Sequence, residues 1–201
     1  MPFSHYGLDH LVSQDLSQLS RCTAPEVTSS FPEASLWVSN FVLNSAFGSP
    51  VENEAKRFAF AFLRRAEAAF VEYERARVTL GEYVQTRPRK PSLYFRVLHH
   101  FEMTIMMLYQ AFDFGRRFVE VRLFEKGNGS DYERLNRIYN VSRHFNPANL
   151  PDDHLHAVWV ANDGIHTADC SLPFEELGEL MTELGRSADR LSRLEREQTQ
   201  T

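Results

Sequence analysis

The residues best suited to chemistry lie in the segment 130–145, which has the spacing of one short helix. At about 100° per residue, Arg137, Asn140 and His144 fall within roughly 60° of one another on one face. A guanidinium that fits phosphate, beside an imidazole that exchanges protons near neutral pH, is a minimal set of groups for cleaving a phosphodiester. The opposite side carries an apolar stripe that we expect to face the core: Leu135, Ile138 and Phe145.

A simpler interpretation of the same face is a solvated helix surface. In that case Glu133 and Arg137 form an ordinary ion pair four residues apart. The spacing alone does not separate the two interpretations, so the elements around the segment must be considered.

Two long helices are predicted before this segment. From Glu52 to about Val84 the apolar residues follow helical spacing without an interrupting proline, and we expect Phe58, Phe62 and Phe70 to be buried. A turn over residues 87–91 ends this helix, and a second one runs from Ser92, as its cap, to about Phe124. The sequence therefore predicts two antiparallel helices over residues 53–84 and 93–124. The second is apolar nearly all round, so it needs two partner helices of its own chain, or one helix and a second subunit.

The remaining elements are shorter. Residues 127–129 break the second helix, and Ser130 with Glu133 forms a capping box that starts the 130–145 helix. Residues 156–169 read as a β-hairpin around an Asn-Asp-Gly turn, and Ser171 or Pro173 marks the start of a last helix. We predict a mainly α fold: an antiparallel helical bundle of two long helices, one short helix and one C-terminal helix, with a small β-hairpin insertion. Residues 1–50 form an N-terminal extension with short helices, and residues 51–201 form the domain.

Composition limits the class of protein. With 201 residues, 43% of them hydrophobic, the chain can bury a core of its own, and it contains no apolar run long enough to cross a membrane. Two distant cysteines and the lack of a secretory pattern at the N-terminus favour reduced thiols and a cytoplasmic location. The net charge is −5, yet residues 86–146 carry eleven Lys and Arg against six Asp and Glu. This basic block could bind a polyanion at one place.

Two other groups of residues could bind ligands. His154, His156 and His166 lie in or beside the predicted hairpin and are residue types that zinc accepts, although their spacing fits no closed four-ligand pattern and we predict no metal site. Arg89 and Lys90, in the turn between the long helices, could contact RNA phosphate or simply be solvated.

The order of two long helices, a short helix with Arg and His, a hairpin and a closing helix resembles the HEPN superfamily of helical-bundle ribonucleases and their inactive relatives. The resemblance covers about residues 52–196. The family signature is an Arg followed four to six residues later by His, which Arg137 and His144 satisfy at its long limit. A polar residue usually follows the Arg, whereas Ile138 stands here and the polar residue is Asn140. Either Arg137 is the signature arginine, or Asn140 and His144 act with Arg143.

The resemblance implies a metal-independent endoribonuclease, without a cofactor, of a toxin or defence type. The RNA 2′-hydroxyl would attack the adjacent phosphorus, His144 would transfer a proton, Arg137 or Arg143 would stabilise the charge, and Asn140 would orient the phosphate or the imidazole. The family also implies a homodimer with two signatures across its interface, and a partner of antitoxin or nucleotidyltransferase type. The alternative is a non-catalytic helical protein-interaction module with an inactive signature.

Overall fold

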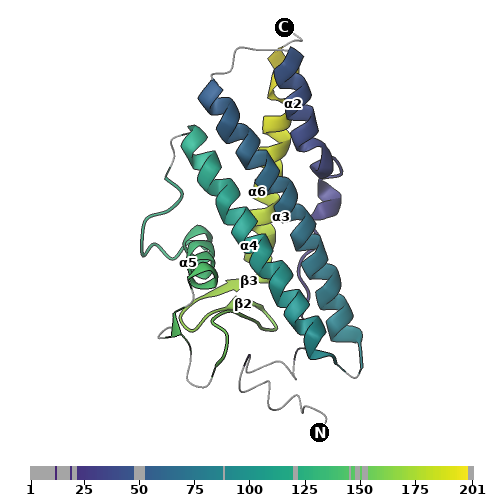
Figure 1. Cartoon of the computed structure of the whole chain (residues 1–201), viewed down its shortest axis with the longest axis vertical. Helices are drawn as coiled ribbons and strands as arrows, with labels where there is room; N and C mark the ends of the chain where they lie inside the picture. The colour runs from purple at the N-terminus through teal and green to yellow at the C-terminus, as the bar shows by residue number, and fades with distance from the viewer. Residues whose placement is uncertain are drawn as a thin grey trace.

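The chain is a helical bundle with a small antiparallel sheet beside it (Figure 1). The computed structural model describes Val12, Leu19 and residues 22–47, 53–87, 89–119, 122–144, 146–147, 150 and 154–198. The predicted fold class, a mainly α bundle with a small β insertion, is confirmed. The elements follow in this order: η1 (Thr28–Ser30), η2 (Ala34–Leu36), α2 (Trp37–Phe47), α3 (Asn53–Gln85), α4 (Pro91–Val119), α5 (Asp131–Arg143), β1 (Trp159–Val160), β2 (Gly164–His166), β3 (Ser171–Pro173) and α6 (Phe174–Gln198).

The long antiparallel helices α3 and α4 form the centre of the bundle. The bounds predicted for α3 agree with the structure to one residue at its C-terminal end. Those of α4 differ, because it begins at Pro91 rather than after a Ser92 cap and ends at Val119. Proline is well tolerated as a first helical residue because its missing N–H would have no helical partner there. The predicted end at Phe124 was wrong: residues 122–124 are not helical, and Leu123 packs against the core from this non-helical segment.

The predicted core of α3 is largely confirmed. Phe62 and Phe70 are buried, whereas Phe58 is only half-buried. Phe58 lies in the second turn of α3, near the end of the bundle where fewer neighbours surround it.

The segment before α3 and the helices that follow it pack into one hydrophobic core. The rings of Phe31, Trp37 and Phe70 pack edge to face with centroids 5.1 to 6.2 Å apart, and the Trp37 indole N–H donates to Asp189 of α6 at 2.7 Å. Such aromatic contacts add stability beyond simple burial. The short helices of the predicted extension therefore pack as part of the bundle.

The sheet has one strand more than the predicted hairpin. β1 pairs with β2, and β2 also pairs with β3, both antiparallel. A Cβ on Gly164 would lie 2.2 Å from the Leu172 carbonyl oxygen, so glycine is required where β2 and β3 approach each other. The last helix was predicted to be marked by Ser171 or Pro173, and α6 begins at Phe174, directly after Pro173. The sequence did not predict that Ser171–Pro173 form β3, which pairs with the second edge of β2.

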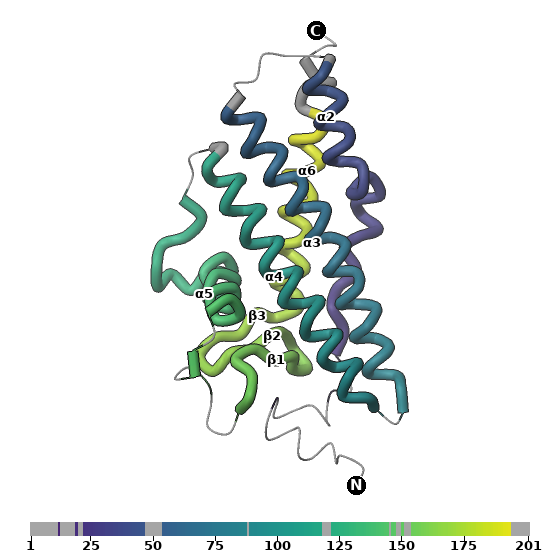
Figure 2. The backbone as a smooth tube through the Cα atoms, viewed as in Figure 1, coloured from purple at the N-terminus to yellow at the C-terminus, as the bar shows by residue number. Residues whose placement is uncertain are grey.

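Figure 2 shows α5 alongside α4, on the side away from α3. α4 also contacts α6 and β1, so most of its apolar middle is covered by elements of its own chain, while Met103 and Met107 line an open hollow beside α3. The homodimer itself stays a prediction. Across the residues that the structure describes, none of the helices combines the length and apolar composition needed to cross a bilayer.

Candidate site in the groove between α4 and α5

The N-terminal end of α5 is held by hydrogen bonds to the preceding glycine-rich turn. The Ser130 hydroxyl accepts from the Glu133 amide at 3.3 Å, as a capping residue should. The Glu133 carboxylate accepts from the amides of Gly127 at 2.6 Å and Gly129 at 2.8 Å, and both glycines have positive φ. The predicted capping box is therefore half-formed, because the Ser130 amide donates to Asn128 instead. The Gly127 and Gly129 amides hold the pKa of Glu133 below its ordinary value.

Arg137 is attached to this same end. Its guanidinium lies 3.5 Å from the Glu133 carboxylate, and its side chain is 48% exposed. The neighbouring Arg134 pairs with Glu176 of α6 at 2.6 Å. The ion pair expected from the simpler interpretation of the helix face is thus present, and Arg137 contacts a carboxylate that also closes the turn.

The three residues of the predicted face do not converge. Asn140 is exposed and donates to Asn136 at 3.0 Å. His144 caps the C-terminal end of α5 with φ −115° and ψ 85°, so it has left the helix and its side chain no longer follows helical spacing. None of the contacts of the described residues joins Arg137, Asn140 and His144. On the inner side Leu135 and Ile138 are fully buried as predicted, while Phe145 lies outside the described residues.

A groove of about 280 Å³ lies next to this segment, between α5 and α4. It gathers polar side chains from three separate parts of the chain. Its lining residues are Tyr139, Ser142 and Arg143 from α5, His99, Glu102, Met103, Ile105 and Met106 from α4, and His156 from the segment before β1.

Glu102 connects two of these side chains. Its carboxylate accepts from the Ser142 hydroxyl at 2.9 Å and lies 3.9 Å from Nε2 of His156. The other ring nitrogen of His156, Nδ1, lies 2.7 Å from the Val158 carbonyl oxygen and 3.2 Å from the Val158 amide nitrogen, so the backbone of Val158 offers a partner to either tautomer. The imidazole is therefore oriented from both sides, with Nε2 facing the carboxylate and the groove.

Arg143 differs from Arg137 in its surroundings. Its guanidinium donates to the Tyr139 hydroxyl at 3.1 Å and lies 6.0 Å from the centre of that ring, which stacks on Tyr109 at 4.3 Å. Within the described residues it has no carboxylate partner. The neutral Tyr139 hydroxyl orients the guanidinium without neutralising its charge, so Arg143 can still bind an anion.

The other predicted residues lie outside this groove. Arg89 donates to the Leu19 carbonyl oxygen and lies over the Tyr83 ring at 5.5 Å, while Lys90 is exposed. His154 is buried against Trp159, and His166 bonds Asp163 at 2.8 Å. In the described part of the chain, His, Cys, Asp and Glu side chains form no group of three or more that could hold a metal ion.

Glu102, Ser142 and His156 were not among the catalytic or RNA-binding residues predicted from the sequence. Ser142 was part of the signature segment, and Glu102 was an isolated acid inside an apolar helix, which is a signal for a specific partner. His156 was weighed only as a metal ligand. No protein-family model, curated protein or solved structure matches the chain.

Proposed function

We propose that the groove between α4 and α5 binds the phosphate backbone of RNA and cleaves it, as a HEPN-like, metal-independent endoribonuclease of a toxin or defence type. The observation that carries the proposal is the convergence of Arg143, His156 and Glu102 on one groove, with Arg143 free of any carboxylate among the described residues. Apart from His156, the residues that line the groove belong to the basic part of the chain, residues 86–146. A cytoplasmic location and an antitoxin or nucleotidyltransferase partner complete the proposal.

The residues match the needs of a 2′-hydroxyl attack. Arg143 binds a non-bridging phosphate oxygen and stabilises the charge that grows on the phosphorane. One imidazole takes the proton of the 2′-hydroxyl as the 2′-oxygen bonds to phosphorus, and a second gives a proton to the 5′-oxygen as that bond breaks. His156, oriented by Glu102 and Val158, is one of these groups. We propose His144 as the other: it follows Arg143 in the chain at the end of α5, although it does not line the groove. The products are a 2′,3′-cyclic phosphate and a free 5′-hydroxyl.

The second candidate function is a non-catalytic helical interaction module. The Arg137–Glu133 contact favours it, because it gives the signature arginine a role in holding the turn before α5.

The test is cleavage of a labelled single-stranded RNA 20-mer in the presence of EDTA. We expect Arg143→Ala and His156→Ala each to lose about 10²- to 10⁴-fold in rate, the usual cost of removing a charge-stabilising or proton-transfer group. Arg186→Ala, which removes an exposed arginine of α6, is the matched control and should cleave like the wild type. A 2′-deoxy substitution at the cleaved position should block the reaction. A wild type that neither cleaves nor binds the RNA would contradict the proposal and leave the interaction module.

A further inference from the structure

The outer face of α3 carries an apolar stripe that the chain leaves uncovered. Phe60, Val71 and Val78 are 36%, 48% and 56% exposed, although each is a large hydrophobic side chain. Spacings of eleven and seven residues place them within about 20° of one another on the helix. Exposed apolar residues scattered singly need no explanation, but a row of three along one helix marks an interaction surface.

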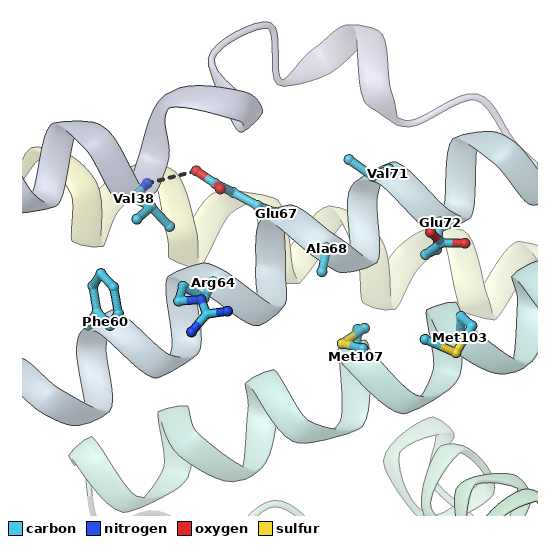
Figure 3. A pocket seen from close by; sticks show the side chains of 9 residues that line it. All are labelled: Val38, Phe60, Arg64, Glu67, Ala68, Val71, Glu72, Met103 and Met107. Carbon is cyan, nitrogen blue, oxygen red and sulfur yellow. Dashed lines mark hydrogen bonds between the residues drawn. The ribbon is translucent and has the colours of Figure 1, made fainter.

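Hollows on both sides extend this stripe, which we call the α3 face. Figure 3 shows the first, of about 510 Å³, where Phe60, Arg64, Ala68 and Val71 of α3 lie between Val38 of α2 and Met103 and Met107 of α4. The second, of about 550 Å³, continues from Phe60 along α2. Phe60 lines both, so the two hollows adjoin at this side chain. Methionine side chains are flexible and adapt to a partner surface.

The charges along the α3 face differ between its two ends. Lys56 and Arg57 in the first turns of α3, and Arg64 farther along, have no ion pair or hydrogen bond with the described side chains. Near the other end Glu82 is exposed and likewise has no ion pair with them. In the middle, Arg75 pairs with Glu72 and Arg77 with Glu74, each at 2.7 Å, while Glu67 accepts from the Val38 amide at 2.8 Å. The stripe is thus basic at one end and acidic at the other.

A helix with this charge order is complementary to itself when reversed. In an antiparallel pair centred near residue 69, Lys56 lies opposite Glu82 of the second copy, and Phe60 lies opposite Val78 of the second copy. Arg64 then lies opposite Glu74 of the second copy, and Val71 lies close to the two-fold axis. We propose that the α3 face binds a second copy of this chain in this antiparallel arrangement, which is the self-complementary contact that a two-fold dimer requires.

The size of the face fits a stable dimer. The distance from Lys56 to Glu82 along the helix is about 39 Å at 1.5 Å per residue. With the flanking side chains of α2 and α4, one helix spacing away on either side, the width is about 20 Å. The resulting footprint of roughly 800 Å² per partner is that of a standard protein interface.

α5 lies on the side of α4 away from α3, so the short helix stays outside this dimer interface. The interface includes Met103 and Met107 of the second long helix, and Met103 also lines the α4–α5 groove, so the two surfaces adjoin along α4. The proposed dimer does not depend on whether the groove cleaves RNA.

Sedimentation of the full chain at micromolar concentration tests the proposal. We expect the wild type to sediment at about twice 23.3 kDa. Val71→Glu should raise the dissociation constant at least about tenfold, because it buries two like charges near the axis. Leu155→Glu, which places the same charge at a residue that is 66% exposed outside the α3 face, is the matched control and should leave the dimer intact.

A charge exchange tests the register. Lys56→Glu and Glu82→Lys should each weaken the dimer by several-fold to about tenfold, and high salt should reduce that effect. The double variant restores opposite charges at both equivalent positions and should recover wild-type association. A monomeric wild type, a Val71→Glu variant that still dimerises, or single variants whose weakening the double variant does not reverse would each overturn the proposal. Equal helicity of all variants by circular dichroism shows that folding is unchanged.

Discussion

The two ends of α5 use similar residues for different purposes. At its beginning, Glu133 accepts from two loop amides and holds Arg137, so its polar groups are used within the chain. At its end, Arg143 has a neutral neighbour and faces a groove that also contains His156. The difference is one of electrostatic availability: an arginine beside a carboxylate is already neutralised, whereas one beside a tyrosine hydroxyl can still bind an anion. The first end holds the helix, and the second is suited to bind a ligand.

The core contact between these ends provides the largest expected effect. Leu135 is fully buried on the inner side of α5, so Leu135→Ala should lower the free energy of unfolding by about 2–5 kcal/mol through lost burial and a residual cavity. Both ends depend on this anchor, and RNA cleavage should fall together with stability. Urea unfolding followed by circular dichroism measures the loss. Leu155→Ala, at an exposed leucine, is the control, and a Leu135→Ala variant as stable as this control would contradict the packing of α5.

Glu133 separates the roles of the two ends. Glu133→Gln keeps one acceptor oxygen but removes the charge, so both the Gly127 and Gly129 amides lose a charged partner and one of them faces an NH2 group that cannot accept. We expect a clear fall in Tm with little change in the affinity of the folded protein for RNA. Asn140→Ala should shift stability by only about 0.5 kcal/mol, because that side chain is exposed. Unchanged Tm in the Glu133 variant would remove the structural role assigned to the beginning of α5.

The effect of Glu133 should depend on pH. Because the folded protein holds its pKa below the ordinary value of 4.5, ionised Glu133 contributes stability above pH 4.5, and this contribution is lost as the pH falls through the folded pKa. The difference in Tm between the wild type and Glu133→Gln should therefore be constant from pH 7 to about pH 5 and shrink below that. Thermal melts across this range measure it. A gap that widens on acidification would reverse the sign and contradict the assigned hydrogen bonds.

The helices could be predicted from the sequence because local spacing determines them. α3 has uninterrupted helical periodicity and is followed by a proline-bounded turn, and both features act over a few residues. The end of α4 and the third strand could not be predicted in this way. Leu123 leaves the helix and packs on the core, and β3 forms only because β2 offers a free edge, so both depend on tertiary contacts.

The candidate site shows the same limit. The residue types of the 130–145 segment pointed to the helix that lines the groove, and Arg143 was among the candidates. The contact of Ser142 with Glu102 joins residues 40 positions apart, and His156 arrives from another segment. These contacts form when α5 and the sheet pack against α4. The spacing of residues along one segment does not predict such packing. Helical spacing also placed His144 on the Arg137 face, but the helix ends one residue earlier.

The smallest expected effect belongs to Arg137, and it decides between the two arginines. The family signature predicts that Arg137→Ala abolishes cleavage. The groove predicts a change of no more than about threefold, because the side chain does not line it and its charge is shared with Glu133. The stability loss should be at most about 0.5 kcal/mol, since the Arg137 side chain is half exposed and solvent screens its charge. Single-turnover cleavage by Arg137→Ala and Arg143→Ala at equal folded concentration makes the comparison direct. If Arg137→Ala is as inactive as Arg143→Ala, the beginning of α5 also contacts the RNA, and the division between the two ends fails.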